Sequence, residues 1–213
     1  MAYAVKEIFY TLQGEGLQTG RPAVFCRFSG CNLWSGKESD RPEAVCRFCD
    51  TDFADTRGPN GGAYGGAYEL VRAIAGVFPG DLLLPMHPLV VLTGGEPALQ
   101  VDGDLIEALH EKGFEIAIET NGTIVLPEGI DWITVSPKAQ TELIVRSGDE
   151  LKLLYPQTGA EPERFESLDF GYFWLQPVDG PIIKENTEAA MQYCLSHPKW
   201  RLSLQTHKIL GMP

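Results

Sequence analysis

Short apolar runs rich in β-branched residues recur along this chain, and each of them ends in a polar or glycine-rich cluster. The runs cover residues 23–28, 89–92, 115–118, 132–135, 151–154, 172–175 and 201–204. Helix-like stretches with one apolar face lie between several of them, at 68–78, 104–112 and 186–196. This alternation of strand and helix predicts parallel strands joined by right-handed crossovers.

The connection at 121–130 is too short for a full crossover helix, so we expect an incomplete parallel (β/α) barrel. The polar clusters that end the runs would then meet at one mouth of the barrel, where active sites of this architecture lie. They cover residues 29–31, 93–97, 119–122, 136–138, 176–177 and 205–208. A Gly-Gly-Ala-Tyr doublet at 61–64 and 65–68 predicts a flexible loop that enters a helix.

Composition limits the class of protein. The 213 residues suit a single domain, 1–213, and an apolar fraction of 44% is enough for a sizeable core. A formal net charge of −12 argues against binding to nucleic acid and makes a small-molecule partner the better expectation. No apolar run approaches the ~20 residues that span a bilayer, and the first residues lack a signal-peptide pattern. We therefore expect a cytoplasmic protein that does not enter a membrane.

Three cysteines carry the strongest chemical signal. Cys46 and Cys49 form a CxxC pair, and Cys31 ends an apolar run fifteen positions before Cys46. Reduced cytosolic cysteines at this spacing favour metal binding over disulfides. Structural zinc needs a closed shell of four ligands, whereas a cubane iron–sulfur cluster held by three thiolates keeps one iron free. The cysteines alone leave both metals open. Cys26 and Cys194 lie in apolar patterns and are expected to be packed thiols.

A Gly94-Gly95-Glu96-Pro97 turn follows the run at 89–92. Two glycines let a backbone approach a ligand closely, and a carboxylate such as that of Glu96 accepts hydrogen bonds from an ammonium group. An ordinary tight turn after a buried strand remains the alternative interpretation.

The cysteine trio followed by this turn resembles the radical S-adenosylmethionine (SAM) superfamily. The resemblance narrows to the 7-carboxy-7-deazaguanine synthase family of queuosine and deazapurine biosynthesis. It is carried by five further motifs, at 8–16, 25–28, 49–51, 119–122 and 136–138. The similarity runs from about Glu7 to the end of the sequence. The superfamily usually spaces its cysteines CxxxCxxC, so residues 32–45 read as an insertion in the cluster loop.

The resemblance implies a radical SAM lyase. Cys31, Cys46 and Cys49 would hold a [4Fe–4S] cluster whose fourth iron binds SAM. The substrate would be 6-carboxy-5,6,7,8-tetrahydropterin, which undergoes radical ring contraction with loss of ammonia to 7-carboxy-7-deazaguanine. The cofactor does the hard chemistry, and no side chain beyond the cluster and SAM is expected to be catalytic. Mg²⁺ is a further implied cofactor, with Thr51 as its expected protein ligand.

The same resemblance assigns two sets of binding residues. The expected SAM contacts are Phe48, Asp50, Gly95, Glu96, Ser136, Lys138 and Gln176. The expected substrate contacts are Leu12, Gln13, Gly14, Glu15, Arg27, Thr93 and the carboxylate of Pro213, with His207 also near the mouth. An ordinary ion pair between Glu15 and Arg27 is the alternative for those two residues.

Partners follow from the same expectation: an electron donor such as flavodoxin or ferredoxin, and a second copy in a homodimer. Two rival functions explain part of the pattern. A radical SAM activase that places a glycyl radical on a partner protein accounts for the cysteines and the Gly94-Gly95-Glu96-Pro97 turn, but not for the motif at 12–16. A zinc-stabilised binding module without catalysis accounts only for the cysteines.

Overall fold

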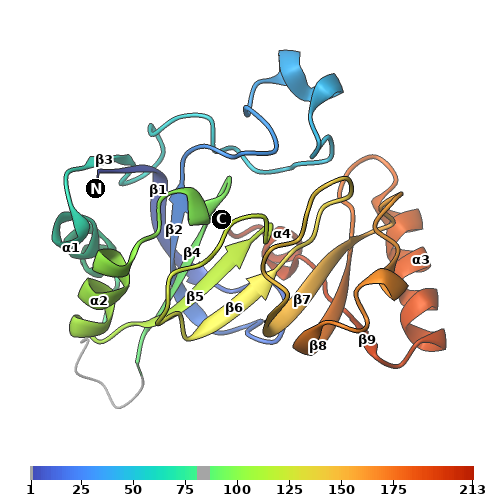
Figure 1. Cartoon of the computed structure of the whole chain (residues 1–213). Helices are drawn as coiled ribbons and strands as arrows, with labels where there is room; N and C mark the ends of the chain where they lie inside the picture. The colour runs from blue at the N-terminus through green and yellow to red at the C-terminus, as the bar shows by residue number, and fades with distance from the viewer. Residues whose placement is uncertain (1, 81–86) are drawn as a thin grey trace.

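The structure, a computed structural model, describes residues 2–80 and 87–213. Within these residues the strands form one sheet in the order β3-β1-β2-β4-β5-β6-β7-β8-β9 (Figure 1). The strands are β1 (Tyr3–Leu12), β2 (Pro22–Phe28), β3 (Gly62–Tyr64), β4 (Leu89–Gly94), β5 (Glu115–Thr120), β6 (Trp132–Val135), β7 (Ser147–Tyr155), β8 (Asp169–Pro177) and β9 (Trp200–Leu202). From β2 onward through β4 to β9, each strand pairs parallel with the next.

Helices cover only part of this sheet. The α-helices are α1 (Ala67–Val77), α2 (Gly103–Glu111), α3 (Ile183–Ser196) and α4 (Thr206–Leu210). In Figure 1, α1 and α2 lie at one end of the sheet and α3 lies at the other. No α-helix separates β5 from β6 or β6 from β7, all of whose connecting residues are described. The expected incomplete parallel barrel is therefore confirmed.

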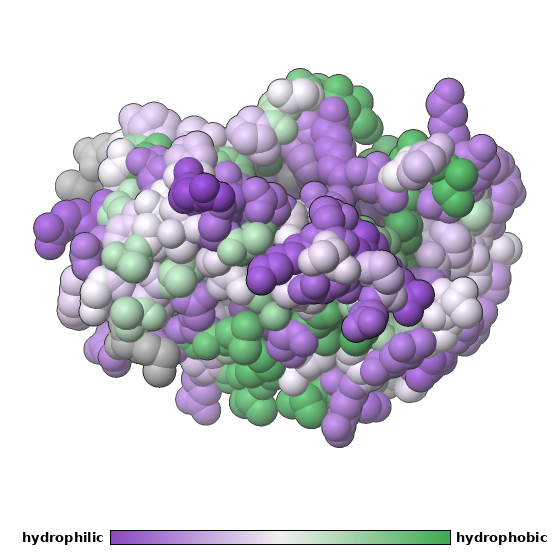
Figure 2. All heavy atoms as spheres, turned by 90° about the horizontal axis from the view of Figure 1, so that it is seen from above, coloured by the Kyte–Doolittle hydropathy of each residue, from purple (hydrophilic) through white to green (hydrophobic). Residues whose placement is uncertain are grey.

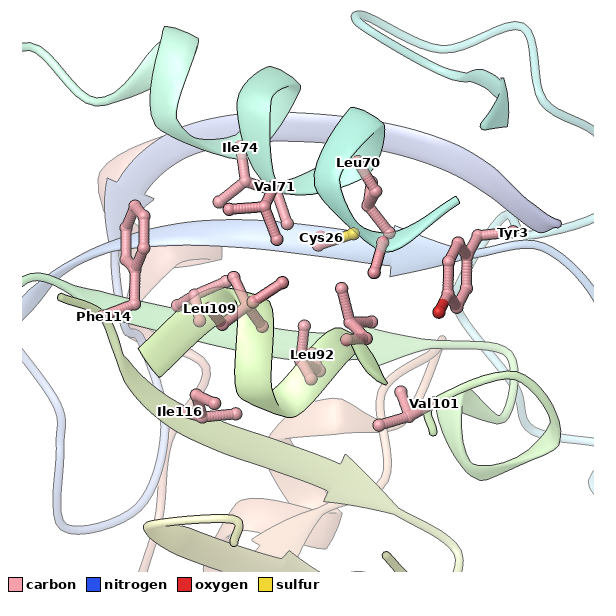
Figure 3. Packing of buried hydrophobic residues seen from close by; sticks show 14 of the residues in the cluster. Tyr3, Cys26, Leu70, Val71, Ile74, Leu92, Val101, Leu109, Phe114 and Ile116 are labelled. Atoms are coloured by element: carbon pink, nitrogen blue, oxygen red, sulfur yellow. The ribbon is translucent and has the colours of Figure 1, made fainter. Parts of the chain in front are cut away.

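The larger apolar core lies between the first two helices and the strands beside them (Figure 3). Leu70 and Ile74 of α1 and Leu105 and Leu109 of α2 are fully buried there, because the i, i+4 spacing of each pair places both side chains on one helical face. Cys26 lies in the same core with no exposed surface, so it is a packed thiol as expected. A second core beneath α3 surrounds Trp200 of β9.

Four parts of the sequence prediction need correction. The first strand, β1, was not expected as a strand; it pairs antiparallel with both β2 and β3. Residues 62–64, expected to be flexible, form β3 because β1 offers them an open edge. The last strand covers Trp200–Leu202 instead of 201–204. The polar cluster after it begins the short helix α4, whose Thr206 backbone and side chain both donate to the Gly14 carbonyl.

No helix among the described residues is long and apolar enough to span a membrane.

Candidate active site

A pocket of about 370 Å³ opens at the carboxyl ends of the strands. Seen from above, the surface there is hollowed between groups of largely hydrophilic residues (Figure 2). Almost every residue that the sequence singled out lines this pocket. These are Leu12, Gln13, Gly14, Glu15, Arg27, Cys31, Cys46, Phe48, Cys49, Asp50, Thr51, Thr93, Gly95, Ser136, Lys138, Gln176, His207 and Pro213. The parallel topology brings many of them together, because the loops after β2, β4, β6 and β8 lie on the same side of the sheet. Residues 12–15 differ: they end or follow β1, which runs antiparallel to β2, and still line the pocket.

The three cysteine thiols all line the pocket. A hydrogen bond from the Cys46 thiol lowers the pKa of Cys49 to about 6. Burial raises the pKa of Cys31. Among the described residues, no group of three or more His, Cys, Asp or Glu side chains already surrounds a single ion position. Three cysteines that line one pocket, with no fourth cysteine among its described lining residues, fit a cluster held at three irons better than a closed zinc shell.

The Gly94-Gly95 turn packs directly against the loop that carries Cys31. Gly94 has φ +157°, and a side chain at Gly95 would place its Cβ 2.1 Å from the Gly30 carbonyl oxygen. The Glu96 amide donates to that same oxygen at 2.9 Å. Glycine is therefore required at position 95 by close backbone contact with the neighbouring cysteine loop.

Glu96 differs from the other expected site residues because it is fully buried and does not line the pocket. Its Oε1 accepts from the Thr120 hydroxyl at 2.6 Å and the Ala98 amide at 3.0 Å. Its Oε2 accepts from the Asn121 amide at 2.7 Å. Burial raises the pKa of this carboxyl group despite these bonds. In this structure the side chain joins the ends of β4 and β5.

A buried cation also lines the pocket. Lys152 of β7 is paired with Glu15 and, at 2.9 Å, with Glu119 of β5. Gln13 donates to the second oxygen of Glu119 at 2.9 Å, and Gln205 donates to Glu15 at 3.1 Å. Burial opposes the charge on Lys152, but the two carboxylates outweigh it and raise the pKa of this ammonium. The network thus presents fixed carboxylate and amide groups from three separate parts of the chain.

Arg27 also faces the pocket, but its partner differs from the alternative expected from sequence. It donates to Glu7 at 2.9 Å, not to Glu15. The antiparallel register places Glu7 directly opposite Arg27. The ordinary ion pair between Glu15 and Arg27 is therefore wrong, because Glu15 is bound to Lys152 instead.

The loop after the CxxC pair is tied down by charges. Lys6 contacts Asp52 at 2.7 Å and Asp55 at 2.8 Å, and is itself almost fully buried. Burial opposes ionisation of Asp50, but the nearby Lys208 ammonium on α4 lowers the pKa of this carboxyl group. The Lys6 contacts connect the loop after the CxxC pair to β1, and the Lys208 contact connects it to α4.

Several pocket residues were not singled out individually from the sequence. They are Lys6, Glu7, Glu119, Lys152, Asp179, Gln205 and Lys208, of which Gln205 and Lys208 belong to the polar cluster at 205–208 that was expected at the mouth. For Lys152 a signal existed, because a single lysine within an otherwise apolar run at 151–154 must find a buried partner. Glu119 opens the polar cluster at 119–122, which was expected at the mouth as a group. Nothing in the neighbouring sequence indicates which residue pairs with each of these charged side chains.

An incomplete parallel barrel with three cysteines at its mouth is the arrangement of the radical SAM enzymes. Curated proteins named 7-carboxy-7-deazaguanine synthase match the whole chain: those of Caulobacter vibrioides and Bradyrhizobium diazoefficiens are 61% identical to it, and each match covers 100% of both sequences. The enzyme of Bacteroides thetaiotaomicron is 42% identical over the same full coverage. The chain belongs to the 7-carboxy-7-deazaguanine synthase family.

A crystal structure of QueE from Escherichia coli has the same fold, with a TM-score of 0.69 and 28% identity. The match covers 96% of this chain and 94% of that one. No family model matches the sequence.

Proposed function

We propose that this chain is a 7-carboxy-7-deazaguanine synthase, acting in queuosine or related deazapurine biosynthesis on 6-carboxy-5,6,7,8-tetrahydropterin. The reaction contracts the ring and releases ammonia. The observation that carries the proposal is that one pocket contains both the cysteine trio and the Lys152 network. Three thiolates suit a redox cluster, and the network suits a polar heterocycle.

Cys31, Cys46 and Cys49 would hold a [4Fe–4S] cluster next to SAM. When bound, the cluster and SAM would supply the radical chemistry of the reaction. The chain's own contribution is to bind, orient and exclude water. Gly95 and Phe48 lie beside the cysteines and suit the methionyl end of SAM. Asp50, Ser136, Lys138 and Gln176 supply polar contacts for the rest of it, and Glu96 supports this wall from behind.

The substrate half of the pocket is formed by residues of β1 and the loop after it. Gln13 and Glu15, held by Lys152 and Glu119, suit the alternating donors and acceptors on the pyrimidine edge of a pterin. Arg27 offers a guanidinium for the substrate carboxylate. Leu12, Gly14, Thr93 and Pro213 complete the enclosure, and the Thr11 hydroxyl donates to the Pro213 oxygen at 3.4 Å.

Mg²⁺ is proposed as a further cofactor. Thr51 lines the pocket directly after Asp50 and offers the kind of hard oxygen that Mg²⁺ prefers. The substrate carboxylate would provide another oxygen.

The remaining assignments complete the proposal. The chain acts in the cytoplasm as a single radical SAM domain, 1–213, with residues 32–45 inserted in the cluster loop. It functions as a homodimer and receives electrons from a flavodoxin or ferredoxin.

The test is an anaerobic assay of the reconstituted protein with reductant, SAM and 6-carboxy-5,6,7,8-tetrahydropterin, with and without Mg²⁺. We expect 7-carboxy-7-deazaguanine and 5′-deoxyadenosine to form without any protein substrate. Protein that binds only zinc, or that binds iron and sulfide yet releases no 5′-deoxyadenosine, would contradict the proposal.

A further inference from the structure

The insertion between the first two cysteines folds back on the cysteine loop. It contains one short 3₁₀ helix, Glu38–Glu43, none of whose residues is buried, and which stands above the strand ends in Figure 1. Its anchor is Trp34, which is only 7% exposed. The Trp34 ring packs edge-on against Phe53 at a centroid distance of 5.5 Å, and its indole N–H donates to the Lys37 carbonyl at 3.2 Å.

Arg41 connects this insertion to the CxxC pair. Its Nη1 donates to the backbone carbonyls of Arg47 and Cys49, both at 2.9 Å. Its other nitrogens donate to the Glu38 carboxylate at 2.7 and 2.5 Å. The guanidinium carbon lies 4.1 Å from the centroid of the Trp34 ring. The guanidinium is thus held on one side by a carboxylate and on its face by an aromatic ring.

The two carbonyls determine how the loop backbone faces the pocket. In a planar trans peptide the N–H points opposite to the C=O. Because the carbonyls of residues 47 and 49 point toward Arg41, the amides of Phe48 and Asp50 point away from it. Both bonds fall within the four residues that contain Cys46 and Cys49, so they fix the turn from which these two thiols project.

We propose that Arg41 is a positioning residue that holds the Cys46–Cys49 turn in its ligand-ready conformation before any metal is bound. The insertion therefore restricts the conformation of the cluster loop, and Glu38 and Trp34 orient the guanidinium. This inference rests on the proposed function only where it treats the three cysteines as cluster ligands; the order of the turn in cluster-free protein is independent of that function.

The first measurement is amide hydrogen exchange in cluster-free protein. In Arg41→Met we expect the Cys49 amide, which donates to the Cys46 carbonyl at 3.4 Å, to exchange at least tenfold faster, equivalent to about 1.4 kcal/mol, while α2 stays protected as in the parent. Arg41→Lys keeps the charge but lacks the fork that reaches two carbonyls and the carboxylate together, so it should exchange like Arg41→Met. The control is Arg57→Met, since the Arg57 side chain is 86% exposed and, among the described residues, forms its hydrogen bonds and ion pair with Asp55 alone.

The second measurement uses reconstituted holoenzyme. Both Arg41 variants should lose iron to a chelator about tenfold faster than the parent and Arg57→Met, by the same free energy. Should Arg41→Met fail to fold, Glu38→Gln leaves Arg41 in place and should still accelerate exchange of the Cys49 amide. Unchanged exchange in Arg41→Met or Glu38→Gln would overturn the proposal, and full protection in Arg41→Lys would show that charge alone suffices. If the parent itself bound no cluster while the exchange results held, the proposed function would be wrong, whereas the positioning role of Arg41 would be supported.

Discussion

Lys152 lies between two carboxylates in the pocket, paired with Glu119 at 2.9 Å and with Glu15 on its other side. The Lys152 side chain is 5% exposed, and the side chains of Glu15 and Glu119 are 13% and 21% exposed. Water and dissolved cations therefore cannot readily replace Lys152 as the partner of these carboxylates. Breaking such a buried pair leaves an uncompensated charge, at a cost of about 3–5 kcal/mol.

Lys152→Met should therefore release Glu15 and Glu119 from their fixed positions. We expect substrate binding to weaken by more than about tenfold, since each misplaced charge-assisted bond is worth about 1.5–3 kcal/mol. Substrate affinity measured by calorimetry, together with steady-state turnover, checks this. Arg21→Met is the matched control, because it breaks an ion pair with Glu115 that does not line the pocket. Equal substrate affinity in Lys152→Met and the parent would contradict the assignment.

The stability cost of Lys152→Met should depend on pH. In the parent, burial opposes ionisation of Glu119, but Lys152 lowers the pKa of this carboxyl group overall. A lowered pKa contributes stability above the unfolded value of about 4.3, and that contribution is lost as pH falls through the folded pKa. In the variant, burial without the cation raises the pKa, so the carboxylate destabilises the fold at neutral pH and is relieved in acid. Urea unfolding should show the largest difference between parent and variant near neutral pH and a smaller one below about pH 5. A difference that is independent of pH would show that lost packing alone is responsible.

Glu96→Gln should lower the free energy of unfolding by about 1–3 kcal/mol, because one of its three donors would face an NH₂ group instead of a carboxylate oxygen. Denaturant unfolding of the cluster-free protein checks this. Glu188→Gln, on the exposed surface of α3, should be close to neutral. A side chain whose only task is to contact SAM would leave the stability of this cofactor-free protein unchanged.

Gly95→Ala should disturb the cysteine loop, because its Cβ would lie 2.1 Å from the Gly30 carbonyl oxygen and 3.0 Å from the Cys31 Cβ. We expect the iron content after reconstitution to fall well below that of the parent. Gly103→Ala provides the same chemical change at the start of α2, where nothing lies within 4 Å of the new atom. That control should bind iron normally and gain up to about 1 kcal/mol of stability from a less flexible unfolded chain.

Thr51→Ala should remove the stimulation of product formation by Mg²⁺ while leaving the cluster absorbance intact. The substitution deletes the hydroxyl together with a methyl group, and only the hydroxyl is an oxygen ligand of the kind that Mg²⁺ prefers. Initial rates over a range of Mg²⁺ concentrations check this, with Thr56→Ala, which lies outside the pocket, as the control. Undiminished stimulation in Thr51→Ala would remove the residue from the metal site.

The parallel part of the fold was predictable because its signals are local. The run at 132–135 matches β6 in both bounds, and the helices begin and end within a few residues of their predicted limits. Apolar periodicity and the polar clusters after each run depend only on neighbouring residues. The polar clusters after the parallel strands therefore lie together in the pocket, whereas residues 12–15 reach it from the end of the antiparallel β1.

The antiparallel edge and the ion pairs depended on tertiary structure. Residues 62–64 form a strand only because β1 lies beside them. Arg27 pairs with Glu7 because of the register between β1 and β2, and Lys152 reaches Glu15 across 137 positions of sequence. The sequence alone determined the parallel scaffold and the identity of the reactive side chains. The partner of each buried charge was decided only by how distant segments of the chain pack together. An ion pair between such segments depends on their relative position in space, and no periodic pattern in the sequence indicates it.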